Sequence, residues 1–273
     1  MTRRHPVHPA LLALLLALAA CATAPPRAPE EPPPANPLAR AAWEEWTAWG
    51  RLTVDGFTDA SPADTAATPE RFDRLVGYWD ALPGGWPVAA RHRQLRQVMQ
   101  PGAVYTMAPR YEDIDYYGSP AWSAAFISAV ARRAGIPEGD LPSASRHARY
   151  VDAALLRWRA APEAATFQPH APEDHAPAVG DLLCADRAPS PLVHWTQRYA
   201  SINRPRPLHC DVVVATAPGR VDVIGGNVMA MVTRRRLPAD AQGRVLPAPD
   251  GYPPVFLVLA ARDVTPVAPP TAP

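Results

Sequence analysis

The pattern of apolar residues changes its period partway along this chain of 273 residues. Before Pro162, apolar side chains recur every three or four residues, which is typical of one buried face of a helix. After Pro162, short apolar or alternating runs replace that pattern and indicate strands, namely 180–184, 210–216, 220–224, 228–234 and 255–260. Helices first and strands afterwards predict an α+β domain, with N-terminal helices packed on a mostly antiparallel sheet of about five to six strands.

Helix boundaries are marked by residues that suit helix ends. The best-defined helix is predicted over 120–134, because Ser119 can cap it, Pro120 suits its first turn and Gly135 ends it. Thr68 is the predicted cap of a second helix. The second helix and three weaker ones are predicted over 69–82, 37–49, 89–99 and 145–159.

The N-terminus has the pattern of an export signal. Arg3 and Arg4 precede an apolar run, 10–20, that is shorter than the roughly 20 residues needed to cross a bilayer. The run ends Leu18-Ala19-Ala20-Cys21, which resembles a lipobox. We expect cleavage before Cys21 and attachment of lipid to its thiol, which would make the membrane a partner. The alternative is an ordinary signal peptide that happens to contain a cysteine.

The residue after Cys21 is Ala22. In the sorting rule for such lipoproteins, Asp at that position favours retention in the inner membrane. The export signal together with the absence of Asp at this position predicts an exported protein that is anchored to the outer membrane and faces the periplasm. The predicted organisation is a signal peptide (1–20), a lipidated Pro-rich linker (21–37), one globular domain (38–263, helical in 38–160 and sheet in 163–262) and a disordered tail (264–273).

Composition argues against several classes of function. The chain has 27 basic and 26 acidic side chains and a formal net charge of +1, which does not favour nucleic-acid binding. The sequence contains no zinc-ligand spacing and no phosphate-binding loop, so we expect neither a metal nor another cofactor. After lipidation of Cys21, the remaining thiols are Cys184 and Cys210. In an oxidising compartment they are either a disulfide between neighbouring strands or two buried free thiols.

Three polar side chains are candidates for catalysis. Ser123 lies at the start of the predicted helix 120–134, His209 enters a strand and Asn227 follows the next strand. Backbone N–H groups at a helix start are unpaired and can hold an oxyanion. A nucleophile on a helix, followed by His and Asn on adjacent strands, has the order of a Cys-His-Asn triad.

These motifs resemble the papain-like superfamily of NlpC-type peptidases and CHAP-type amidases. There, a nucleophile opens a helix, a Gly-Asp strand follows as in Gly180-Asp181-Leu182-Leu183, and a later strand begins with His. More closely, residues 120–234 resemble a bacterial lipoprotein family, domain of unknown function 2272. The resemblance implies a papain-like domain in which Ser123 is the nucleophile, His209 the base, and Asn227 or a neighbour the group that orients the base.

The nucleophile position departs from the superfamily, because Ser123 stands where those enzymes have Cys. A helix dipole contributes roughly 0.3–1 kcal/mol, less than one pKa unit, so Ser123 would depend on His209 for deprotonation. From the order of these motifs and the predicted lipid anchor, we expect an amidase or peptidase that acts on peptidoglycan or wall peptides. The alternatives are a binding lipoprotein of the same fold without catalysis, and a serine esterase or acyltransferase.

Four further residues are candidates for cleft or orienting positions. Asp211 shares the face of His209 on an alternating strand and could orient it, whereas Cys210 points to the opposite face. If His209 faces the helix of Ser123, Cys210 faces away from it. The other candidates are Trp122, His147 and Trp195, although His147 is better interpreted as exposed. The run 234–236 is interpreted as a solvated strand end.

Overall fold

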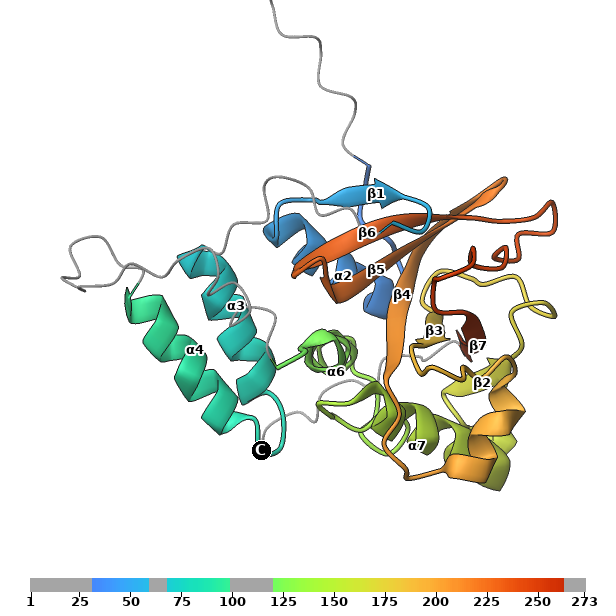
Figure 1. Ribbon diagram of the computed structural model, residues 1–273, viewed down its shortest axis with the longest axis horizontal. Helices are drawn as coiled ribbons and strands as arrows, with labels where there is room; N and C mark the ends of the chain where they lie inside the picture. The colour runs from blue at the N-terminus through green and yellow to red at the C-terminus, as the bar shows by residue number, and fades with distance from the viewer. Residues whose placement is uncertain (1–30, 59–67, 99–119, 263–273) are drawn as a thin grey trace, which may run out of the picture. The chain divides into compact units, whose positions relative to one another are not determined.

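The computed structural model describes residues 31–58, 68–98 and 120–262 (Figure 1). The chain divides into a short unit, Met1–Pro32, and a larger compact unit, Pro33–Pro273, and the fold below is that of the larger unit. The predicted signal peptide, Cys21, Ser119 and the tail 264–273 lie outside the described residues. The predictions about export, lipidation and the tail therefore stay predictions.

Within the described residues, seven strands form one mixed sheet in the order β1-β6-β5-β4-β3-β7-β2. The strands are β1 (Thr53–Asp55), β2 (Phe167–His170), β3 (Leu182–Asp186), β4 (Leu208–Ala217), β5 (Arg220–Val228), β6 (Met231–Pro238) and β7 (Val255–Ala261). The β1–β6 pair is parallel, and the remaining neighbours are antiparallel. The five predicted strand runs correspond to β3–β7, and β1 and β2 extend the sheet at its two edges.

The predicted helices are all present with shifted ends. They are α2 (Pro37–Ala48), α3 (Pro69–Asp80), α4 (Trp86–Val98), α6 (Ser123–Arg133) and α7 (His147–Ala160), with short 3₁₀ helices η2 (Pro162–Ala164) and η3 (Trp195–Ser201). The side chain of Thr68 accepts the Arg71 N–H and caps α3, as its position predicts. The α6 helix begins at Ser123, later than predicted, and its N-cap Trp122 makes no side-chain capping bond.

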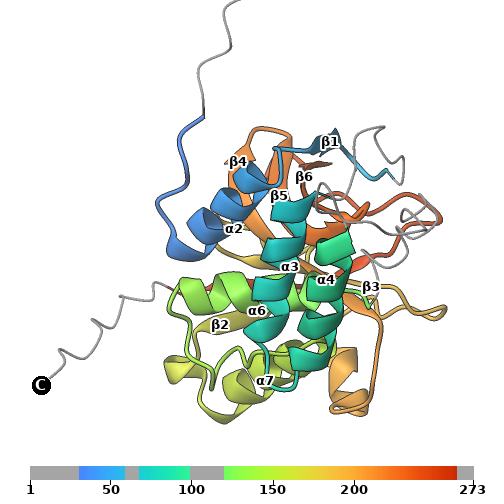
Figure 2. The same ribbon diagram turned by 90° about the vertical axis from the view of Figure 1, so that its left-hand side faces the viewer.

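Helices α2, α6 and α7 pack on the sheet through strands on one face (Figure 1). Large aromatic side chains fill this interface, and the rings of Trp49 and Trp122 stack with centroids 4.9 Å apart. Figure 2 shows α3 and α4 side by side, and α3 packs against α6 from outside the helical layer. The opposite face of the sheet carries a smaller apolar cluster that includes Leu183, Val213 and Val258.

Alternation along β4 sorts the candidate site residues between these two faces. Cys210 and Val212 belong to the core beneath the helices, whereas Val213 belongs to the cluster on the opposite face. By the same alternation, His209 and Asp211 lie on the face opposite to the helical core. His209 therefore points away from the core that α6 covers, and it approaches the start of that helix through His147, whose ring centroid lies 5.1 Å from that of His209 and whose Nε2 lies 2.6 Å from Ser123 Oγ. His209 lies near the end of β4, where the first turn of α7 approaches the strand.

The two remaining cysteines are joined by a disulfide between β3 and β4. Cys184 and Cys210 are directly opposed in the antiparallel register, with Cα atoms 4.1 Å apart, and both are fully buried. The bond therefore fixes β4 to its neighbour immediately beside His209. Among the described residues, no helix combines the length and the apolar character that a membrane span requires.

Candidate functional site

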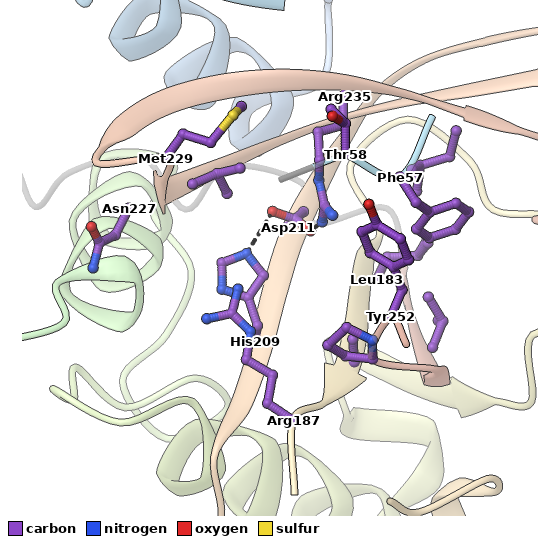
Figure 3. Close-up of a pocket in the computed structure, with 15 residues that line it drawn as sticks. Phe57, Thr58, Leu183, Arg187, His209, Asp211, Asn227, Met229, Arg235 and Tyr252 are labelled. Atoms are coloured by element: carbon purple, nitrogen blue, oxygen red, sulfur yellow. Dashed lines mark hydrogen bonds and ion pairs between the residues drawn. The ribbon is translucent and has the colours of Figure 1, made fainter. Parts of the chain in front are cut away.

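A cavity of about 400 Å³ opens on the sheet face opposite to the helical core (Figure 3). Its walls come from the segment after β1, from strands β3–β7 and from the loop before β7. The polar residues that line it include Arg187, His209, Asp211, Asn227, Arg235 and Tyr252. Two of the three predicted catalytic residues, His209 and Asn227, therefore lie at this cavity, whereas Ser123 does not line it.

His209 and Asp211 form a buried pair at the floor of the cavity, with Nε2 of the ring 3.0 Å from Oδ1 of the carboxylate. Asp211 also accepts a short hydrogen bond from Arg235. Burial alone would raise the pKa of Asp211, but the charge of Arg235, followed by the interactions with His209, outweighs burial and holds this pKa well below its usual range. Asp211 is therefore an ionised carboxylate that can only accept hydrogen bonds.

Asp211 also determines which nitrogen of His209 carries the proton. Burial is the largest influence on His209 and lowers its pKa, which favours the neutral ring. Because the carboxylate of Asp211 only accepts, Nε2 carries the single proton of that ring and Nδ1 carries the lone pair. Nδ1 is buried and has no hydrogen-bond partner within the described part of the chain. A buried acceptor without a donor is uncommon in folded proteins and points to a functional role.

Ser123 is hydrogen-bonded to His147 rather than to His209. Ser123 is the first residue of α6 and His147 the first residue of α7, and Ser123 Oγ lies 2.6 Å from His147 Nε2. The interpretation of His147 as exposed is wrong, because only 5% of the residue is exposed. The N–H of Cys210 donates to His147 Nδ1 over 3.1 Å, and the Tyr150 hydroxyl contacts the same nitrogen.

The bond from Cys210 fixes the protonation of His147. A backbone N–H can only donate, so Nδ1 is the acceptor and the neutral ring carries its proton on Nε2. Burial, followed by the charges of His209 and Arg187, lowers the pKa of His147 well below its ordinary value and keeps the ring neutral. His147 therefore donates to Ser123 Oγ and cannot accept the Ser123 proton in this arrangement. The Ser123 O–H remains available to a different acceptor.

The two pairs meet as one cluster. The rings of His147 and His209 have centroids 5.1 Å apart and planes inclined by 52°. Ser123 has a proton to donate, and His209 Nδ1 has a lone pair without a donor among the described residues. The cluster therefore contains a donor and an acceptor that complement each other, although the structure does not join them.

Gly225 and Gly226 allow β5 to lie close to this cluster. A Cβ atom on Gly225 would lie 1.7 Å from Asp211 Oδ1 and 3.2 Å from His209 Nε2. A Cβ atom on Gly226 would lie 2.5 Å from Phe126 Cβ, on the face covered by α6. A side chain is therefore excluded at Gly225 on one face and at Gly226 on the other, so that the His209–Asp211 pair and α6 can both approach β5 there.

The other predicted residues have different surroundings. Asn227 lines the cavity, but it does not hydrogen-bond His209 Nδ1, so the predicted Ser123–His209–Asn227 chain of contacts is not formed. Trp122 is fully buried and packs against the Trp49 ring, so it is a core residue and not a cleft residue. Trp195 lies in η3 and does not line the cavity beside His209.

The cavity also contains residues that the sequence did not single out. Arg187, Arg235 and Tyr252 line it together with His209. Interpreting 234–236 as a solvated strand end is wrong, because Arg234 is 3% exposed and bound to Asp222, and Arg235 binds Asp211. The alternation of side chains along β6, the strand that follows the Gly-Gly segment, could have identified Arg235 as a cavity residue, since alternate residues of β6 point toward the cavity.

A family described as "Uncharacterized protein conserved in bacteria (DUF2272)" matches residues 73–253, a longer span than the predicted resemblance over 120–234. No curated protein and no solved structure matches the chain. Within the described residues, no group of three or more His, Cys, Asp or Glu side chains is arranged to hold a metal ion.

Proposed function

We propose that this chain, which belongs to the bacterial DUF2272 family, is a hydrolase of papain-like type whose nucleophile is Ser123, whose base is His209 and whose orienting group is Asp211. The observation that carries the proposal is the geometry of the His209–Asp211 pair, with Nε2 3.0 Å from the carboxylate and Nδ1 buried without a partner among the described residues. Asp211 holds the proton of His209 on Nε2 and so leaves a lone pair at Nδ1. A base oriented by a carboxylate in this way is the arrangement of catalytic triads. Asp211 takes the role that the sequence suggested for Asn227.

The mechanism requires one bond that the structure does not contain, between the Ser123 hydroxyl and His209 Nδ1. Rotation of the Ser123 side chain is the movement we propose for making it, because catalytic hydrogen bonds are often long or absent before substrate binds. Ser123 Oγ then attacks a carbonyl carbon while its proton passes to His209 Nδ1. The imidazolium that forms is stabilised by Asp211. It then gives the proton to the leaving group, and water releases the acyl group by the same steps.

His147 has a supporting role in this proposal. Its Nε2–H points at Ser123 Oγ, so it stabilises negative charge as that oxygen loses its proton. Serine needs such help more than cysteine, because its hydroxyl is almost never ionised near neutral pH. The buried and neutral state of His147 keeps this donor fixed.

We propose that the substrate is an amide bond in peptidoglycan or a wall peptide, and that the protein is exported and lipid-anchored through Cys21. This part rests on the sequence Leu18-Ala19-Ala20-Cys21 and the Pro-rich segment after it. Labelling cells with a radioactive or clickable fatty acid tests the anchor. We expect labelled protein from the wild-type gene and none from Cys21→Ala. Equal labelling of both would contradict lipidation at this residue.

Hydrolysis is tested with the lipidated chain in nanodiscs, incubated with purified muropeptides and with nitrophenyl esters. Product masses identify the bond that is cleaved, and faster cleavage of the esters would favour the esterase or acyltransferase alternative. Ser123→Ala and His209→Ala should each abolish turnover, and the double variant should lose little more, because triad members act as a unit. Ser123→Cys should retain activity. Ser190→Ala, at an exposed serine, is the control.

A binding protein without catalysis is the second candidate. Two observations favour it: Ser123 does not line the cavity, and its oxygen already accepts a bond from His147. In that case wild type and Ser123→Ala bind muropeptides equally, and neither cleaves them.

A further inference from the structure

The starts of α6 and α7 meet at the contact between Ser123 and His147, but neither helix fixes its first residue by capping. The residues that precede them, Trp122 and Arg146, make no side-chain capping bond. Both helices pack on β4, and few residues of one lie close to residues of the other. Since neither caps nor extended helix packing explains how the two starts are held together, another interaction has to do so.

Ser128 provides such an interaction. It lies in the second turn of α6 and is 3% exposed. Its Oγ accepts the N–H of Ala144 over 3.0 Å, and its hydroxyl donates to Ala124 O at 2.9 Å or to Ala144 O at 3.1 Å. The contact with Ala124 is the bond to the carbonyl four residues earlier that a helical serine often makes. Ser128 therefore ties α6 to the main chain just before His147.

Packing alone does not explain a serine at this position. A buried hydroxyl lowers stability unless it is hydrogen-bonded, and α6 has alanine at the buried positions 124, 125, 129 and 131. An alanine in place of Ser128 would fit the same layer, but it would leave the N–H of Ala144 without its acceptor. The use of a serine is therefore explained by its bonds to the segment that leads into α7.

A neighbouring serine in that segment makes a different kind of contact. The N–H of Ser143 donates to the Glu138 carboxylate over 2.7 Å, and the Ser143 hydroxyl donates to the same carboxylate. These bonds join the segment to itself and not to α6. Ser143 is therefore a matched comparison for Ser128, because both hydroxyls act on the residues just before α7.

We propose that Ser128 is a positioning residue, which holds Ala144 against α6 and so keeps the Nε2–H of His147 aimed at Ser123 Oγ. The N–H of Cys210 fixes the other side of the same ring, so the imidazole is held from the sheet and from the helix. The effect on turnover rests on the proposed function, since it assumes that Ser123 is the nucleophile. Ser128 itself takes no part in bond making or proton transfer.

The test is magic-angle-spinning NMR of the lipidated chain in nanodiscs, with histidine isotopically labelled at its ring nitrogens. Two rings carry a proton on Nε2, that of His147 bonded to Ser123 and that of His209 bonded to Asp211. The variants His147→Gln and His209→Gln assign the two N–H signals. Ser123→Ala shows where the His147 signal lies once its acceptor has been removed.

Ser128→Ala should move the His147 signal toward its position in Ser123→Ala and leave the His209 signal unchanged. In muropeptide hydrolysis, kcat should fall by about tenfold with little change in KM, because a misplaced assisting group slows the chemical step without altering the cavity. Ser143→Ala is the control, and it should keep both signals and the wild-type kcat.

Three spectroscopic results would overturn the inference. They are an unchanged His147 signal in Ser128→Ala, the loss of both N–H signals in that variant, or an equal shift in Ser143→Ala. Loss of both signals would mean that Ser128 supports the whole fold and not this contact.

The activity assays separate this inference from the proposed function. A wild type that cleaves nothing, together with the expected shift of the His147 signal, rejects the proposed hydrolysis and keeps the positioning role. Hydrolysis by wild type with an unchanged kcat in Ser128→Ala rejects this inference alone.

Discussion

Ser123 Oγ and His147 Nε2 lie 2.6 Å apart, and the backbone of Cys210 on the other ring nitrogen decides that the histidine is the donor. A serine beside a histidine at the start of a helix would ordinarily be interpreted as a nucleophile with its base. Here the same contact removes His147 from that role and leaves the base position to His209. The role of each histidine therefore follows from which of its nitrogens is already occupied.

The first prediction concerns the stability that His147 provides. His147→Leu should lower the free energy of unfolding by about 1–3 kcal/mol, because it leaves the buried N–H of Cys210 without an acceptor. Tyr150→Phe removes only the hydroxyl that contacts Nδ1 and should cost less. Urea denaturation of the three proteins measures the order. An equal cost for both variants would contradict the assigned acceptor role of Nδ1.

The second prediction concerns Gly225. Gly225→Ala places a methyl group in the space of Asp211 Oδ1, so it should cost about 1–3 kcal/mol in stability and displace the His209–Asp211 pair. Turnover or ligand binding should fall with it. Gly77→Ala, on α3 with open space around its Cβ position, is the control and should stabilise by about 0.5–1 kcal/mol. Normal activity in Gly225→Ala would show that the pair is not needed.

The third prediction concerns pH. The pKa values of His147 and His209 are lowered in the folded protein, chiefly by burial, so the unfolded chain binds protons first as the pH falls below about 6.5. The stability from neutral burial is present above about pH 6.5 and is lost as the pH falls toward the folded pKa values. The loss approaches about 1.4 kcal/mol per pH unit for each ring.

Urea denaturation midpoints measured between about pH 7.5 and 5.5 report this loss. Asp211 does not contribute to it, because its depressed pKa keeps the carboxylate ionised throughout that range. His209→Gln should show a shallower dependence than wild type. A stability that is flat across the window in wild type would mean that the two rings are not buried in the neutral form.

The fourth prediction concerns the Cys184–Cys210 disulfide. Replacing both cysteines by alanine should cost about 2–4 kcal/mol, since the bond closes a loop with a sequence separation of 26 residues. Both sulfur atoms belong to fully buried residues, so a reducing agent should have little effect on the folded protein and should destabilise it only after unfolding. Rapid reduction under native conditions would contradict this burial.

Local sequence patterns predicted the helices and five of the strands. The runs 210–216 and 255–260 have enough residues to show their period, whereas β1 and β2 have three and four residues. Their strand conformation depends on partners far along the chain, Arg234–Arg236 for β1 and Val258–Ala261 for β2. No window centred on β1 or β2 contains that information.

The sequence predicted which residues lie at the site more successfully than it predicted the contacts between them. Alternation placed Asp211 beside His209 and turned Cys210 toward Cys184, and the structure has both arrangements. The pairing of Ser123 with His147 was missed, because it depends on how two separate helices pack on β4. A helix pattern predicts which face is buried, but it does not predict which residue of another helix lies opposite.

The position of β7 has a consequence for how this chain reaches its folded state. The last strand of the described chain, Val255–Ala261, lies between β3 and β2, so it inserts within the sheet and does not extend an edge. Until those residues emerge, β3 has an open side and β2 has no partner, and exposed strand sides invite pairing with other chains. Synthesis or translocation that stops before Val255 should therefore yield an aggregation-prone chain, and a chaperone would have to protect β3 until the end of the polypeptide arrives.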